Sequence, residues 1–124
     1  MIVDRKTGQP GNRLPDPPMR GPIGKFIYDH FTPLVLMAFE ELGFCKRGEG
    51  GPFVSDGKLL WPNGALPFNT SGGNLSEGYI HGMQNTIEAV RQLRGVAINQ
   101  VKDAEIAFIA SGNAVPNTAM IVHR

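Results

Sequence analysis

The chain has 124 residues, of which 41% are hydrophobic and 19% charged, an ordinary composition for one modest globular domain. Its 12 basic and 11 acidic residues give a formal net charge of +1, which provides no electrostatic basis for binding nucleic acid or acidic membranes. No apolar run approaches the roughly 18 residues of a membrane span, and no signal-peptide pattern opens the chain. Because Cys45 is the single cysteine, the chain has no internal disulfide, and we predict a cytoplasmic location.

Residues 1–22 differ in composition from the rest. They contain five prolines and three glycines, and five of the twelve basic residues fall at or before Lys25. Such a segment can bury little apolar area. We therefore expect an extended or disordered arm over residues 1–22 and one domain over residues 23–124.

The first ordered elements are predicted to be a strand at 25–28 and a helix. Thr32 is a candidate N-cap with Pro33 at the first helical position, and Gly43 is a natural stop. The apolar residues between these signals share one helical face: Phe31, Leu34, Val35, Ala38, Phe39 and Leu42. Tyr28, Asp29 and His30 then occupy the strand-to-helix turn, where catalytic groups are common in α/β folds.

The middle of the chain is predicted to contain a loop or weak hairpin at 46–64 and a short strand at 66–68. A second helix is predicted from about residues 79–82 to Arg94, with Gly95 as its stop. Its apolar face is formed by residues at helical spacing: Ile80, Met83, Ile87, Val90 and Leu93.

Two almost wholly apolar segments, 104–110 and 118–122, are predicted to be strands buried on both faces, joined by a loop over 111–117. The order of elements predicts an α/β fold. Its sheet should be mixed, with at least one parallel crossover and a final pair of strands that can be antiparallel.

The segment from Asn69 to Gly82 carries four glycines and leads into the second helix. It lacks the Gly-Lys-Ser/Thr of a Walker loop and the Gly-x-Gly-x-x-Gly of a dinucleotide site. Two roles therefore remain open for these glycines, a tight strand-to-helix turn or close contact with a substrate.

Tyr28 and Tyr79 are the only tyrosines, and each precedes a histidine by two residues, His30 and His81. A tyrosine at such a junction often packs with its hydroxyl tied to the backbone, whereas the neighbouring histidines favour an acid/base role. The histidines lack metal-ligand spacing, so we predict no metal site.

From Tyr28 to Arg124 the chain resembles the C-terminal half of the thiolase superfamily. The segments that carry this resemblance are Asn69–Gly73, Gly78–Gly82, Glu88–Gly95 and Ala119–Val122. Ordinary thiolases have Gly-His-Pro where this chain has Gly78-Tyr79-Ile80. Their Asn-Glu-Ala-Phe corresponds to 28–31, and their late catalytic cysteine falls near Ser111. These departures argue against Claisen-type acyl transfer.

One branch of the superfamily shares the departures. The segments Tyr28–Pro33, Glu40–Cys45 and Tyr79–Met83 look like those of lipid-transfer-protein thiolase homologues that act as steroid side-chain aldolases. The resemblance implies a thiolase-like partial domain and retro-aldol cleavage of a β-hydroxyacyl-CoA to a ketone and a shorter acyl-CoA. It implies no cofactor beyond the coenzyme A of the substrate. It also implies dimerisation and a DUF35-type OB-fold partner.

Retro-aldol cleavage needs a base for the β-hydroxyl and donors for the thioester enolate, but no covalent cysteine. We expect Tyr28 and Tyr79 to fill these catalytic roles, in an order that the sequence leaves open, while His30 and His81 tune or orient them. The substrate-binding or orienting set is completed by residues of the glycine loop: Asn69, Gly72 and Gly73.

Members of this branch are much longer than this chain. Three explanations are open: a truncated gene product, a subunit of a split enzyme whose N-terminal thiolase half is separate, or a small binding module. The functional alternatives to the aldolase are a non-catalytic acyl-CoA or lipid-binding or complex-assembly protein, and a degenerate acyltransferase fragment.

Overall fold

The structure, a computed structural model, describes residues 23–111 and 118–124. The predicted arm at 1–22 and most of the predicted loop at 111–117 lie outside these residues. The elements are, in order, β1 (Ile23–Ile27), α1 (Thr32–Glu41), α2 (Gly50–Ser55), the 3-10 helix η1 (Gly73–Leu75), α3 (Met83–Arg94), β2 (Ile106–Ala110) and β3 (Ala119–His123).

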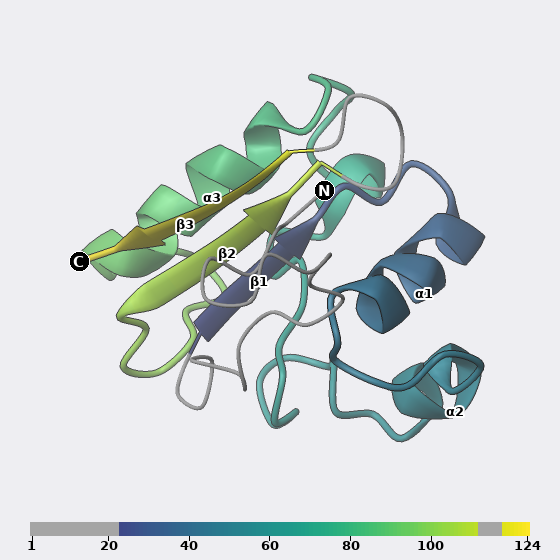
Figure 1. Cartoon of the computed structure of the whole chain (residues 1–124). Coiled ribbons are helices and arrows are strands. Elements are labelled where there is room, and N and C mark those ends of the chain that lie inside the picture. Colours follow the sequence, from purple (N-terminus) through teal and green to yellow (C-terminus); the bar gives the residue numbers. More distant parts are fainter. Residues whose placement is uncertain (1–22, 112–117) are drawn as a thin grey trace, which may run out of the picture.

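The three strands form one mixed sheet in the order β1-β2-β3 (Figure 1). β1 pairs with β2 in parallel, and β2 pairs with β3 antiparallel. The predicted α/β class, the parallel crossover and the antiparallel final pair are therefore confirmed. The predicted strand at 66–68 is reduced to a single bridge, in which Phe68 pairs with Lys25 of β1.

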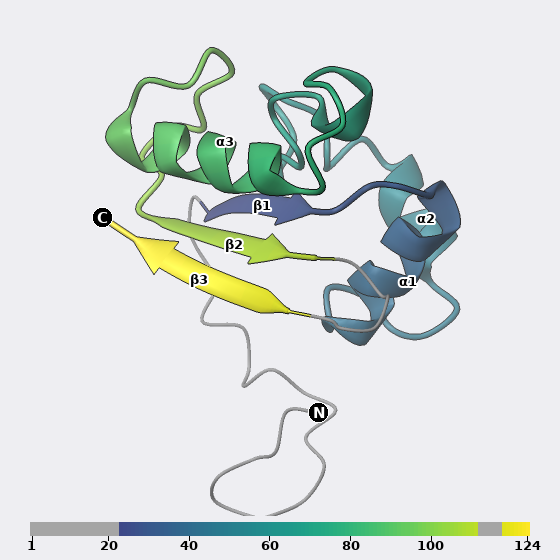
Figure 2. The ribbon, with the colours of Figure 1, turned by 90° about the horizontal axis from the view of Figure 1, so that it is seen from above.

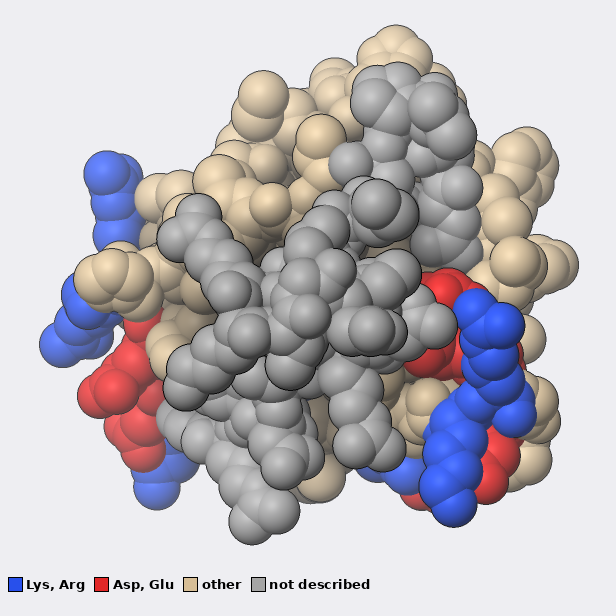
Figure 3. All heavy atoms as spheres, in the orientation of Figure 1, with Lys and Arg blue, Asp and Glu red and all other residues tan. Residues whose placement is uncertain are grey.

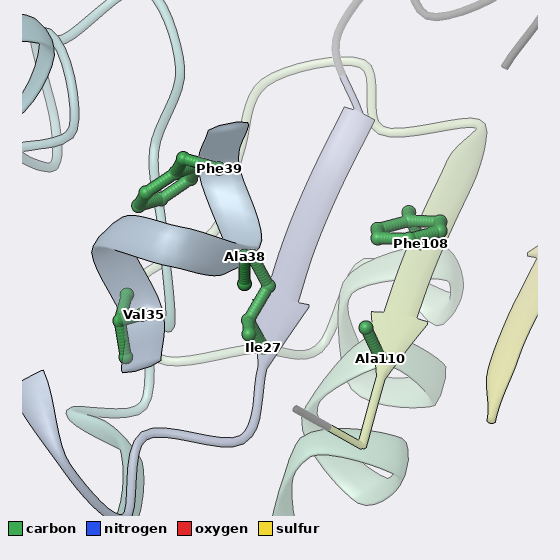
Figure 4. Close-up of a cluster of buried hydrophobic side chains, with 6 residues drawn as sticks. All are labelled: Ile27, Val35, Ala38, Phe39, Phe108 and Ala110. Atoms are coloured by element: carbon green, nitrogen blue, oxygen red, sulfur yellow. The ribbon is translucent and has the colours of Figure 1, made fainter. Parts of the chain in front are cut away.

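The core is divided between the two faces of the sheet. α3 lies along one face (Figure 2), where Ala89 and Leu93 pack against Phe26, Ala107 and Ile109. On the other face, α1 packs against β1 and β2 (Figure 4), through a buried cluster of Ile27, Val35, Ala38, Phe39, Phe108 and Ala110. Both faces of β2 are thus covered, and its carboxyl end lies beside that of β1.

Tertiary contacts changed two predicted elements on the α1 side. The loop or weak hairpin predicted at 46–64 is wrong in part, because Gly50–Ser55 forms α2. The amide of Gly50 donates to Glu40 Oε1 over 3.0 Å, a contact from α1 that local composition could not reveal. The cap of α1 is Phe31, whose extended backbone precedes Thr32, so the predicted Thr32 cap is displaced by one residue.

The most informative correction concerns α3, because most of its predicted apolar face is turned away from the sheet and Leu93 is the one residue of that face that the helix buries. Met83, Ile87 and Val90 are 57%, 40% and 37% exposed, and we call these three residues the outer stripe of α3. The helix instead buries four polar side chains with Ala89 and Leu93: Gln84, Asn85, Glu88 and Gln92. The prediction that β3 is buried on both faces is also wrong, since β3 is an edge strand and mostly exposed.

Candidate active site

Tyr28 and His30 lie where the chain leaves β1. The amide of Tyr28 donates to the carbonyl of Ala110 over 2.9 Å, which extends the β1–β2 pairing by one residue. The rings of Tyr28 and His30 are stacked, with centroids 4.7 Å apart and planes 22° from parallel. The buried Nδ1 of His30 has no hydrogen-bond partner among the described residues.

Tyr79 and His81 approach this stack from the loop before α3. The centroids of Tyr28 and Tyr79 are 6.4 Å apart, and the ring of His81 meets that of Tyr79 edge-on at 4.7 Å. His81 has a φ of 53° and Gly82 one of 86°, so the chain turns sharply just before the helix begins. The structure therefore brings together the four aromatic residues that the sequence singled out.

Two of these residues, Tyr28 and His81, line a cavity of about 790 Å³ between the carboxyl end of β2, the start of β3 and the first turn of α3. Tyr28 and His81 contribute polar atoms, and most of the remaining wall is apolar, including Met83, Ile109 and Met120. Ser111, at the position where the resemblance puts the thiolase cysteine, lines the same cavity. An apolar hollow with a few convergent polar groups is typical of a small-molecule site.

The two tyrosine hydroxyls share a hydrogen bond. This bond, helped by partial burial and by the negative charge of Asp29, raises the pKa of Tyr28 to about 12. The hydrogen bond to Tyr79 thus favours the protonated form of Tyr28.

The three predicted residues of the glycine loop hold the backbone and do not line the cavity. The Asn69 side chain accepts from the amide of Ile27 over 3.1 Å and donates to its carbonyl over 2.9 Å, as a neighbouring strand would. Gly72, with a φ of 94°, is the N-cap residue just before η1. Gly73, with a φ of 64°, lies against the carboxylate of Asp29.

Sequence reasoning missed the polar groups that support the loop. Asp29 accepts from the amide of Asn74, whose side-chain oxygen accepts from the Gln84 side chain. Further along α3, Glu88 and Gln92 both bond to the Thr70 hydroxyl, over 2.8 and 2.9 Å. The sequence signal that could have revealed these groups is the set of polar residues that alternate with apolar ones along α3.

Neither a metal site nor a membrane-spanning helix is found in the part of the chain that the structure describes. In residues 23–111 and 118–124, no three His, Cys, Asp or Glu side chains gather as they would around a metal ion. The helices within these same ranges are too short or too polar to cross a bilayer.

Fold and cavity together describe part of an α/β domain whose site is built on paired tyrosines. The sequence family described as "Thiolase C-terminal domain-like" matches residues 25–123, and the chain belongs to this family.

Its curated relatives include aldolases and lyases. The chain is 51% identical over 96 residues to the steroid side-chain-cleaving aldolase of Thermomonospora curvata, a match that covers 77% of this chain and 24% of the relative. It is 48% identical over 96 residues to the 17-hydroxy-3-oxo-4-pregnene-20-carboxyl-CoA lyase of Mycobacterium tuberculosis, covering 77% of this chain and 25% of the relative. The chain thus spans about a quarter of the length of these relatives.

The structure resembles a solved chain described as "Ltp2-ChsH2(DUF35) aldolase". The TM-score is 0.74 at 48% identity, over 81% of this chain and 26% of that chain. These matches confirm two predictions from the sequence: the thiolase-like partial domain and the resemblance to the aldolase branch of the superfamily.

Proposed function

We propose that the chain forms part of an acyl-CoA lyase that cleaves a β-hydroxyacyl-CoA by a retro-aldol reaction. One observation carries the proposal. Tyr28, which lines an apolar cavity, shares a hydrogen bond with Tyr79 from a separate segment, and Ser111 lines the same cavity at the position of the thiolase nucleophile. The reaction needs a base and an enolate donor and no thiolate, which matches this set of side chains.

In the proposed reaction, Tyr79 acts as its phenolate, whose oxygen takes the proton of the β-hydroxyl while the bond between Cα and Cβ breaks and later returns that proton to Cα. The β-carbon becomes a ketone, and the electron pair passes to the thioester as an enolate. When substrate is bound, the Tyr28 O–H turns from Tyr79 to the substrate and donates to the enolate oxygen. Return of the proton to Cα gives the shorter acyl-CoA, so the reaction balances without an oxidant or reductant.

The proposed substrate class is a steroid whose side chain ends in a CoA thioester. In the compound named for the Mycobacterium tuberculosis relative, the hydroxyl on carbon 17 is β to the carboxyl group carried by carbon 20. Cleavage between carbons 17 and 20 would leave a ketone at carbon 17. The apolar wall of the cavity, formed in part by Met83, Ile109 and Met120, suits such a ring system.

We also propose that the working enzyme includes the rest of a thiolase-like fold, supplied outside the described residues, with a DUF35-type OB-fold partner and a second thiolase-like subunit. Support comes from the quarter-length match and from apolar surface beside the site. The outer stripe of α3 is exposed, and Met83 belongs both to this stripe and to the cavity wall. A cytoplasmic location stays a prediction.

The test is a chimera in which residues 25–123 replace the matching segment of the Thermomonospora curvata aldolase. We expect the chimera to release a ketone and a shorter acyl-CoA from a 17-hydroxy steroid 20-carboxyl-CoA. Tyr28→Phe and Tyr79→Phe should each lower kcat on the order of 10²-fold or more, because each removes one proton-handling group.

Trp61→Phe is the matched control. It also removes one polar hydrogen from an aromatic ring, but Trp61 lies on a loop outside the cavity, where its indole donates to the Gln100 carbonyl over 3.2 Å. We expect it to leave kcat unchanged. An active chimera that tolerates both tyrosine substitutions would refute the catalytic assignment. A folded chimera that binds the thioester without cleaving it would favour the non-catalytic lipid-binding alternative.

A further inference from the structure

We infer that Asp29 is a positioning residue that fixes Tyr79 relative to Tyr28 by clamping the glycine loop to the turn after β1. The inference rests on the proposed function of the two tyrosines, but its geometric consequence can be measured without turnover. Asp29 stands between Tyr28 and His30 in the sequence, so any segment that it holds is tied to the turn that carries these two residues.

The Asp29 carboxylate fits into the loop where a side chain would otherwise be. Its Oδ1 and Oδ2 lie 3.1 and 3.3 Å from the amide nitrogen of Asn74. A Cβ added to Gly73 would lie 2.0 Å from Oδ2, so the carboxylate occupies this space. Gly73 also has a φ of 64°, which a residue with a side chain rarely adopts. Glycine at 73 and aspartate at 29 are therefore complementary.

The clamp is relayed to the start of α3. The Asn74 side-chain oxygen accepts a hydrogen bond from the Gln84 amide group, and Gln84 is only 1% exposed. This contact closes the segment 74–84, with Tyr79 five residues from either end. Asp29 thus anchors one end of the segment to the Tyr28 turn, while Gln84 anchors the other end to the helix.

Tyr79 depends on this closure because burial does little to hold it. Its side chain is 63% exposed, and its ring contacts are with Tyr28 and His81, which is exposed as well. Tyr28 in turn packs against the loop, since a Cβ on Gly82 would lie 3.3 Å from its Cδ2. Release of the clamp would leave Tyr79 on a chain segment with few other constraints.

The direct test uses the fact that the chain has only two tyrosines. Proton NMR should show cross-relaxation between the Tyr28 and Tyr79 rings, whose centroids are 6.4 Å apart. In Asp29→Ala we expect this signal to disappear while circular dichroism keeps the helical spectrum. In Asp29→Asn, which retains an acceptor oxygen for the Asn74 amide, we expect the signal to remain.

Asp56→Ala is the matched control, because the Asp56 carboxylate also accepts from a backbone amide, that of Lys58, over 3.0 Å and lies outside the cavity wall. It should leave the ring signal intact. Gly73→Ala is a second route to the same effect, since the added methyl would displace the carboxylate, and it keeps the inference testable if Asp29→Ala fails to fold.

The kinetic counterpart uses the chimera. We expect Asp29→Ala to lower kcat on the order of 10²-fold, since displacement of a reacting group by about 1 Å has that effect, while KM changes less. Asp29→Asn should restore most of kcat. A folded Asp29→Ala chain with the ring signal intact overturns the inference, whatever the activity. An inactive parent chimera with a ring signal that depends on Asp29 refutes only the proposed function.

Discussion

Tyr28 holds its proton more firmly than a free tyrosine. Its pKa is raised to about 12, chiefly by the hydrogen bond to Tyr79. A group whose pKa is raised in the folded chain favours folding below its unfolded pKa of about 10, and this stabilisation is lost as the pH rises toward the folded value. The free energy of unfolding should therefore fall between about pH 10 and 12, and by less in Tyr28→Phe.

The same pair gives a direct prediction for titration. In Tyr79→Phe, Tyr28 is the only tyrosine left, and it has lost the hydrogen bond that contributes most to its raised pKa. Its pKa should fall toward the ordinary value of about 10. Absorbance of tyrosinate near 295 nm measures this midpoint, with circular dichroism checking the fold at each pH. A midpoint that stays near 12 in Tyr79→Phe would show that the shared bond is not the cause.

At the scale of elements, α3 has its polar side toward the protein. The side chain of Gln92 donates to the Thr70 hydroxyl and to the Asn99 carbonyl, over 2.9 and 2.8 Å, and accepts from the amide of Val101 over 2.8 Å. These bonds tie two loops to the helix where water cannot replace them, because Gln92 is 1% exposed. Polar residues are buried here because the loops around the site have backbone groups that need partners.

Gln92→Ala should therefore lower the free energy of unfolding by about 1–3 kcal/mol, the range expected when buried hydrogen-bonding groups lose their partner. Val90→Ala on the same helix is the contrast, since Val90 belongs to the outer stripe of α3 and should change stability by less than about 0.5 kcal/mol. Urea denaturation of both variants measures the difference. A larger effect for Val90 would mean that α3 buries its apolar side.

The buried polar side of α3 shows which features of the fold the sequence could predict and which it could not. Periodicity located α3 and β2 to within a few residues, and motif resemblance picked out Tyr28 and Tyr79. The same periodicity was right for Leu93 but placed Met83, Ile87 and Val90 on the wrong side of α3, because a spacing rule assumes that the apolar side meets the core. The clamp by Asp29 escaped prediction for a related reason: it joins residues 45 positions apart, and only the folded loop brings them into contact.

At the scale of the whole molecule, apolar side chains of α3 and β3 are exposed in the described part of the chain. Lys and Arg side chains lie mixed with Asp and Glu at two separate sides of the face drawn in Figure 3, and the upper part of this face shows none of them. Beyond the outer stripe of α3, two residues of β3, an edge strand of the described sheet, are exposed: Met120 on the α3 side of the sheet and Ile121 on the opposite side. Exposed apolar patches and open strand edges both favour association.

We therefore expect the purified chain to self-associate, and the outer stripe of α3 to be the main cause. The triple variant Met83→Gln, Ile87→Gln, Val90→Gln should sediment as a monomer over a concentration range in which the parent chain forms larger species. A variant with the same number of apolar-to-glutamine changes at exposed positions elsewhere is the control: Leu60, Leu75 and Ile98.

The chimera tests whether the outer stripe of α3 is apolar because another part of the enzyme covers it. If the rest of a thiolase-like fold covers α3, the three stripe substitutions should lower the thermal stability of the chimera, because they put polar groups into a buried interface. The control substitutions should not. If both sets have equal effects on sedimentation and on chimera stability, the stripe is ordinary surface. In that case α3 would hold the loops through its buried polar side chains, and no other part of the enzyme would cover the outer stripe.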